Sequence, residues 1–165
     1  MSAPSIVSIE LLADHRDLIP VVGELRWREW GHPAEPEQLE CWVDITGREA
    51  GRDYLPVTWV AIDPGRQVVG AVGLGQFDIE ERRDRSPWVL GMIVETQYRG
   101  RGLGGKLMKA LEAWAYQHGY SQAWVASDGA VGFYQKCGWA LAEIISHSSG
   151  ETMSVLSKSL KTNKE

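Results

Sequence analysis

The segment from Val89 to Gly119 restricts the fold more than any other part of the sequence. It begins with the short apolar run VLGMIV, continues through the turn RGRGLGG, and ends in a stretch whose apolar residues recur every three or four positions. Such a run is typical of a buried strand, and that spacing places apolar side chains on one face of a helix. The sequence predicts strand, glycine-rich turn and helix in succession, with His118 and Gly119 ending the helix. The apolar helix positions are Leu103, Leu107, Leu111 and Trp114.

The turn in this segment has a chemical use. The first N–H groups of a helix have no intrahelical partner, and the helix dipole places partial positive charge there. Glycines allow a bulky anion to approach those N–H groups, because no Cβ stands in the way. Arg99, Arg101 and Lys106 add full positive charges around the same point. The pattern predicts a binding site for a phosphate or pyrophosphate group.

Length and composition restrict the class of protein. A chain of 165 residues predicts one domain over residues 1–165, with a core over about 5–160. The net charge of −5, with no basic patch outside the turn, argues against nucleic acid. No apolar window is long enough for a membrane span, no signal peptide is evident, and two cysteines are too few for a disulfide framework. We therefore expect no membrane partner and a cytoplasmic location. Four scattered histidines show no metal-ligand spacing, so no metal is expected.

The remaining elements follow from local patterns. Asp14 is the predicted N-cap of a first helix that ends at Gly31, and the mixed charges of 78–85 predict a solvated loop. A second helix is predicted to open at 35–37, with Leu39, Trp42, Val43 and Ile45 on its inner face. The other predicted elements are a strand at 5–12, a hairpin of 55–62 and 67–77, a strand at 121–126, a short helix at 129–136, and a hairpin of 139–147 and 151–160. The tail after 160 is expected to be frayed. The order β-α-α-β-β-β-α-β-α-β-β predicts an α+β domain with a mixed, mostly antiparallel sheet of about seven strands and four helices.

Two elements together carry a family resemblance. The first is Arg99-Gly100-Arg101-Gly102-Leu103-Gly104, and the second is the run AVGFYQKCGW at 130–139. In this order and at this spacing they resemble the GNAT superfamily of N-acetyltransferases. The resemblance centres on residues 88–144, and the element order extends it over nearly the whole chain. It implies a GNAT-like fold and transfer of acetyl from acetyl-CoA to an amine, with a small-molecule amine favoured, by direct transfer in a ternary complex. A homodimer is left open.

The resemblance also implies roles for individual residues. The turn would hold the pyrophosphate of coenzyme A, and the strand before it would pair with the pantetheine arm and stabilise the oxyanion through a backbone N–H. Tyr134 would protonate the departing thiolate, because a phenol and a thiol titrate at neighbouring pH values. The implied acetyl-CoA-binding residues are Met92, Ile93, Val94, Arg99, Gly100, Arg101, Gly102, Leu103, Gly104 and Gly105.

The acceptor side departs from the family pattern. Trp88 stands where many members have a glutamate, and Ser127 stands where an asparagine is common, so the general base is unassigned. The candidates are Glu29, His32, Asp78, Glu80, Glu81 or a chain of waters. The implied acceptor contacts are Trp27, Trp30, Asp78, Glu80 and Trp88, with core packing as the alternative for each tryptophan and a solvated face as the alternative for the acids.

Two other functions compete with this interpretation. Gly100, Gly102 and Gly105 also satisfy G-x-G-x-x-G, and Asp128 follows the next predicted strand, as in a dinucleotide-binding fold. Against it, residues 95–99 separate the strand from the first glycine, and too little chain follows for a doubly wound sheet. The second alternative is a regulatory module that binds acyl-CoA without turning it over, and the missing glutamate is its support.

Overall fold

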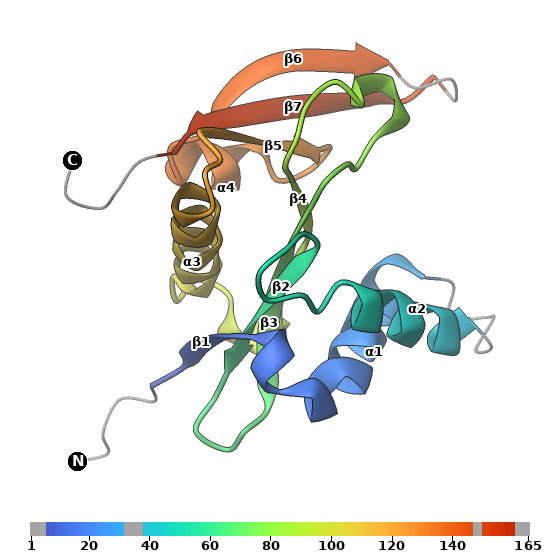
Figure 1. The fold of residues 1–165 in the computed structure, drawn as a ribbon, viewed down its shortest axis with the longest axis vertical. Coiled ribbons are helices and arrows are strands. Elements are labelled where there is room, and N and C mark those ends of the chain that lie inside the picture. Colours follow the sequence, from blue (N-terminus) through green and yellow to red (C-terminus); the bar gives the residue numbers. More distant parts are fainter. Residues whose placement is uncertain (1–5, 32–37, 147–149, 161–165) are drawn as a thin grey trace. The chain divides into compact units, whose positions relative to one another are not determined.

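The computed structural model describes residues 6–31, 38–146 and 150–160 (Figure 1). Within these ranges the chain forms seven strands and four α-helices, in the order that the sequence predicts. Their bounds are β1 Ser8–Leu11, α1 Ile19–Trp30, α2 Gln38–Arg48, β2 Val57–Ile62, β3 Val68–Gly75, β4 Trp88–Val94, α3 Leu103–Gln117, β5 Gln122–Ser127, α4 Val131–Lys136, β6 Ala140–Ser146 and β7 Thr152–Ser159. None of the helices described is both long and apolar enough to cross a bilayer.

The strands form one sheet in the order β1-β2-β3-β4-β5-β7-β6. Antiparallel pairing joins β1 to β2, β5 to β7 and β6 to β7, while β4 pairs with β5 in parallel at Trp88 and Trp124. The predicted fold class, a mixed and mostly antiparallel sheet with four helices, is confirmed.

The chain divides into two compact units, each with a core of its own. The first comprises Met1–Gly73 and Gly91–Ala110, and the second comprises Leu74–Leu90 and Leu111–Glu165. The single domain expected from the chain length stays a prediction, and the two units are described separately below.

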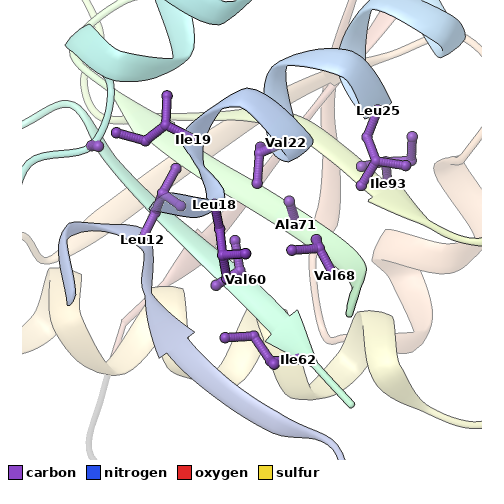
Figure 2. Packing of buried hydrophobic residues seen from close by; sticks show 11 residues of the cluster. Leu12, Leu18, Ile19, Val22, Leu25, Val60, Ile62, Val68, Ala71 and Ile93 are labelled. Atoms are coloured by element: carbon purple, nitrogen blue, oxygen red, sulfur yellow. The ribbon is translucent and has the colours of Figure 1, made fainter. Parts of the chain in front are cut away.

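The core of the first unit forms where α1 packs on β2 and β3. Ile19, Val22 and Leu25 recur every three residues along α1, so they share one face of the helix (Figure 2). That face meets side chains of β2 and β3, and burial of each such side chain stabilises the unit by about 1.5–3 kcal/mol. The buried residues of this cluster are Leu12, Leu18, Ile19, Val22, Leu25, Ala50, Val60, Ile62, Val68, Ala71 and Ile93.

A buried arginine ties α1 to its neighbours in the same unit. The Arg26 guanidinium donates to Glu49 Oε1 at 2.8 Å, to Thr46 Oγ1 of α2 at 3.3 Å and to Thr58 Oγ1 of β2 at 3.3 Å. Only 4% of Arg26 is exposed, so its charge depends on Glu49 for compensation. Nothing in the local sequence pattern of α1 predicts this burial.

The core of the second unit surrounds a tryptophan pair. Trp88 has no exposed surface, and its ring centroid lies 6.4 Å from that of Trp124. The indole N–H of Trp88 donates to the carbonyl oxygen of Arg85 at 2.8 Å, which satisfies the one polar group of that side chain. Ile79, Ile145 and Val155 complete the buried cluster, with Trp124, Ala126 and Met153 packed against it.

The helix that the sequence predicts within Val89–Gly119 is present as α3. All four of its predicted apolar positions are buried, at exposures of 4% for Leu103, 0% for Leu107 and Leu111, and 8% for Trp114. At its end Gly119 has a φ of +92°, the left-handed conformation in which glycine commonly terminates a helix.

Other local predictions were wrong. Asp14 does not cap the first helix. It lies in a short 3₁₀ turn, η1 Leu12–Asp14, and pairs with Arg52, whereas α1 follows Leu18. Burial of Leu12 and Leu18 decides this path, since both belong to the core of the first unit. In α2, Ile45 is exposed and Thr46 takes the buried position. The predicted start of the second helix at 35–37 and the tail at 161–165 lie outside the described residues.

The charged run 78–85 is more than a solvated loop. It contains the 3₁₀ turn η3 Glu80–Arg82, and two of its arginines, Arg82 and Arg85, both bind Glu143 of β6. Those two guanidinium groups lower the pKa of the Glu143 carboxyl to about 2, chiefly through the hydrogen bond from Arg82. The loop is therefore held to β6 by a carboxylate that stays ionised through most of the acidic range.

A first prediction concerns the closest approach of α1 and α2. A Cβ on Gly23 would lie 2.8 Å from the Val43 Cα, so Gly23→Ala should force the helices apart and destabilise the protein by about 1–3 kcal/mol. Ala at a helix position otherwise gains up to ~1 kcal/mol over Gly. Gly132→Ala in α4, where a Cβ would meet nothing, is the matched control. Thermal unfolding should show a lower midpoint for Gly23→Ala alone, and equal midpoints would contradict the packing argument.

A second prediction concerns acid stability. Because the folded pKa of Glu143 lies below its ordinary value of 4.5, its ionisation stabilises the fold above pH 4.5, and this contribution is lost as the pH falls toward about 2. Glu143→Gln should lower the unfolding midpoint at pH 7, and its difference from wild type should shrink between pH 4.5 and 2. A difference that stays constant over that range would show that the ion pairs are not its source. Glu151→Gln serves as the exposed control.

Candidate functional site

The glycine-rich turn between β4 and α3 leaves open space where side chains would otherwise lie. After β4 the chain passes through a short 3₁₀ turn, η4 Thr96–Tyr98, and then adopts the left-handed conformation twice, at Gly100 (φ +77°) and Gly102 (φ +79°). Apart from the adjoining residues of the chain, no atom of the described residues lies within 4 Å of the place that a Cβ would occupy at either glycine. The backbone of the turn is therefore accessible to a ligand.

Helix α3 begins at this turn, so its first N–H groups have no partner within the helix. The N–H of Lys106 donates to the carbonyl oxygen of Gly102 at 3.1 Å, which is the first hydrogen bond of the helix. The N–H groups of residues 103–105 precede that bond, at the positive end of the helix dipole. Arg101 and Lys106 line a small hollow of about 80 Å³ beside the turn, together with Val7, Tyr98 and Leu103. The helix-start N–H groups, the helix dipole and two cations together favour an anion at this position.

Two arginines of the turn are held by contacts that the sequence did not predict. The Nε of Arg99 donates to the carbonyl oxygen of Val94 at 3.0 Å, and the Arg101 guanidinium lies 5.1 Å from the centroid of the Tyr98 ring. The Tyr98 hydroxyl donates to Asp63 Oδ2 at 3.2 Å, in the turn between β2 and β3. Tyr98 thus connects that turn to the glycine-rich turn, although no sequence pattern links the two.

The end of β4 lies against the core of the first unit. Ile93 is buried and packs against Leu25 of α1 (Figure 2), whereas Met92 and Val94 are half-buried. Gly91, in the middle of β4, has a φ of +48°, and a Cβ at this position would lie 3.4 Å from the Trp30 ring. A hollow of about 130 Å³ opens here, lined by Leu25, Arg28, Glu29, Ile93, Val94, Glu95, Thr96 and Arg99.

A comparison with protein-family models decides the class of the protein. The model of the acetyltransferase (GNAT) family matches residues 19–139, a range that includes α1, β4, the glycine-rich turn and α4. This chain belongs to the GNAT acetyltransferase family. It is an N-acetyltransferase that uses acetyl-CoA as its acyl donor, and this assignment replaces the dinucleotide-binding alternative.

Solved structures share the GNAT fold at low sequence identity. An aminoglycoside 6'-N-acetyltransferase complexed with coenzyme A matches with a TM-score of 0.75 and 14% identity, over 96% of this chain and 98% of the other. Aminoglycoside 6'-acetyltransferase type Ii matches with a TM-score of 0.73 and 17% identity, over 96% and 99%. A chimeric spermidine N-acetyltransferase from Vibrio cholerae matches with a TM-score of 0.69 and 15% identity, over 93% and 95%. A search of curated proteins found no match.

Tyr134 lies in α4, in the second unit of this acetyltransferase. Its side chain is buried, with 5% of the residue exposed, and its ring meets those of Phe133 and Trp139 edge to face. Burial raises the pKa of the Tyr134 phenol to about 12, and the charges of Cys137 and Asp78 add to the effect. The phenol therefore carries its proton at neutral pH, as a proton donor must.

A polar network holds the end of α4. Glu112 of α3 accepts a hydrogen bond from the Trp139 indole N–H at 3.1 Å and pairs with Lys158 of β7 at 2.8 Å. The Lys158 ammonium also donates to the carbonyl oxygen of Cys137 at 2.7 Å. At the other end of α4, Ser127 Oγ accepts the backbone N–H of Ala130 at 2.9 Å. The sequence predicted the helix but not the contacts of Glu112 and Lys158, because their partners are distant along the chain.

The predicted acceptor residues have different environments. Trp88 is a core residue, as described above, so the structure assigns it the packing role that the sequence left open as an alternative. Trp27 is half-buried, and its indole N–H has no hydrogen-bond partner among the residues that the structure describes, whereas Trp30 is 44% exposed. Asp78 and Glu80 are exposed, and Glu80 pairs with Arg83. Of the candidate bases, His32 lies outside the described residues, whereas Glu29 lines the hollow beside β4.

A third prediction tests the glycine-rich turn. Gly102→Ala should reduce the affinity for coenzyme A at least tenfold, because an L-residue disfavours the left-handed backbone by roughly 1–2 kcal/mol and its Cβ would enter the space open to the ligand. Gly119→Ala is the matched control, since Gly119 is also left-handed with open space around it, at the other end of α3. Calorimetric titration with coenzyme A should show the loss in Gly102→Ala only. Equal affinities in both variants would rule out the anion site.

Proposed function

We propose that this acetyltransferase moves acetyl from acetyl-CoA to a small-molecule amine by direct transfer within a ternary complex. The observation that carries the donor half is the open, left-handed glycine turn at the start of α3, with Arg99, Arg101 and Lys106 around it. In the proposal, the N–H groups of the turn and of the first helical residues hold the pyrophosphate of coenzyme A, and the arginines oppose its charge.

The end of β4 is proposed to hold the reacting part of the donor. The backbone of Met92, Ile93 and Val94 pairs with the pantetheine arm, and a backbone N–H of this strand donates to the thioester carbonyl oxygen. That donor then stabilises the negative charge that develops on the oxygen when the amine attacks. The hollow lined by Ile93 and Val94 supports this placement, because it leaves space beside the strand.

The chemical step is a nucleophilic acyl substitution. The neutral amine nitrogen bonds to the carbonyl carbon and gives its surplus proton to solvent. The bond between that carbon and the thioester sulfur breaks, and the sulfur leaves as a thiolate. We propose that Tyr134 gives the thiolate its proton. A free thiol titrates near ~8.5, well below the pKa of about 12 of the buried phenol. A thiolate in an equally desolvated site would have its own pKa raised in the same direction, which brings the two groups closer.

The small-molecule acceptor is supported by the similar structures. Aminoglycosides and spermidine, the substrates that name them, are small amines. Cys41 and Cys137 are free thiols, which fits the cytoplasmic location that we also propose.

A fourth prediction tests the proton donor. Tyr134→Phe should lower kcat by about 10²–10⁴-fold and leave the affinity for acetyl-CoA nearly unchanged, because only the proton transfer is removed. Tyr116→Phe, a change of the same size at an exposed position of α3, should leave kcat unchanged. Release of the thiol from acetyl-CoA, followed over a panel of amines, provides the measurement. A Tyr134→Phe enzyme with the wild-type rate would refute the role.

The same assay tests the function as a whole. Thiol release that depends on an added amine, with the acetylated amine found by mass spectrometry, would support an enzyme of this class. Tight binding of coenzyme A without thiol release for any amine would instead favour a regulatory module that binds acyl-CoA.

A further inference from the structure

The hollow beside β4 contains a carboxylate that the proposed reaction does not yet use. Leu25 of α1 packs on Ile93 of β4 (Figure 2), and both residues line the hollow. Glu29 follows Leu25 by four residues, so it lies one turn further along the same face of α1. The hollow thus brings the Glu29 carboxylate to the strand that is proposed to hold the thioester.

The other charged groups of this hollow have contacts within the protein. Arg28 and Glu95 form an ion pair at 3.8 Å, and the Nε of Arg99 donates to the carbonyl oxygen of Val94. Glu29 makes no ion pair or hydrogen bond with any residue in the described part of the chain, and it is solvent-exposed. Its charge is therefore available to a cation that enters the hollow.

The residue after Glu29 in α1, Trp30, also lies against β4. Trp30 is 44% exposed, and its ring atoms Cζ3 and Cη2 lie 3.4 and 3.5 Å from the place that a Cβ on Gly91 would occupy. These are ordinary contact distances, so the indole lies against the strand at residue 91. The face of an indole attracts cations. Two consecutive residues of α1 thus present a carboxylate and an aromatic ring beside β4.

We infer that Glu29 binds the ammonium group of a cationic acceptor, with Trp30 beside it, and so selects alkylamines over neutral amines. This inference rests on the proposed function and specifies its substrate class. A neighbouring carboxylate raises the pKa of an ammonium group. Glu29 therefore supplies affinity for the protonated amine and opposes its deprotonation, so it is a specificity residue and not the general base.

Glu29→Gln provides the test, with Glu24→Gln as its matched control. Both residues are exposed on α1, but Glu24 does not line the hollow. The probes are 1,4-diaminobutane, which is cationic at pH 7.5, and aniline, which is neutral. Each binds to protein saturated with coenzyme A and is measured by calorimetry, so the result does not depend on turnover. Glu29→Gln should bind the diamine about tenfold or more weakly and aniline as wild type does, while Glu24→Gln should bind both normally.

The pH dependence gives a second readout. If the enzyme acetylates the diamine, kcat should rise with pH as the bound ammonium loses its proton. Glu29→Gln removes the neighbouring carboxylate and so lowers the pKa of that ammonium. The rise in kcat should therefore occur at lower pH in this variant. If Glu29 had only a structural role, its replacement would not shift the pH at which kcat rises.

Three outcomes would overturn the inference. These are unchanged diamine binding by Glu29→Gln, an equal loss for diamine and aniline, and a wild-type protein that binds no cationic amine. They are distinct from failure of the proposed function, which would be the absence of thiol release with every amine. Titration with coenzyme A and thermal unfolding should give wild-type values for both variants, which shows that any loss is confined to the acceptor.

Discussion

The site depends on a backbone that only glycine adopts easily. Between β4 and α3 the chain turns through left-handed conformations at Gly100 and Gly102, and this turn determines where α3 begins and which way its first N–H groups face. With side chains at these positions, the turn would be strained and the ligand space filled. The cations around the turn increase its affinity for anions, but the glycine conformation is what exposes the donors.

Glycine is also required near β4, the strand before the turn. Gly70 of β3 approaches β4 so closely that a Cβ there would lie 3.1 Å from the carbonyl oxygen of Ile93. Gly91 would place a Cβ 3.4 Å from the Trp30 ring, an ordinary contact distance, and its φ of +48° is what favours glycine there. In the first unit, the glycines of the turn therefore leave open space, whereas Gly70 allows two strands to approach closely. The same residue type serves opposite purposes, and only the surroundings of each glycine distinguish them.

Whether the sequence predicts a structural feature depends on how far apart in the chain the interacting residues lie. The element order, the buried face of α3 and the glycine-rich turn depend on residues close together in the chain, so local patterns predict them. The contact of Tyr98 with Asp63 and the network of Glu112 with Lys158 join residues that only the fold brings together. Trp88 shows the limit at a single position. Its type is compatible with a pocket or a core, and its complete burial beside Trp124 assigns it to the core.

Within a few residues, helix α1 carries both a buried side chain that holds the helix in place and the exposed side chains that we propose contact the acceptor. Arg26 is fixed by Glu49, Thr46 and Thr58, so any loss of these partners would leave a charge buried without compensation. Glu29 and Trp30, one turn later, are exposed, and neither places a buried charge in the core. Mutations at these two positions can therefore accumulate at little cost to folding, while the helix that presents them stays in place. An acetyltransferase built in this way can change its acceptor over evolutionary time and keep its donor site and core intact.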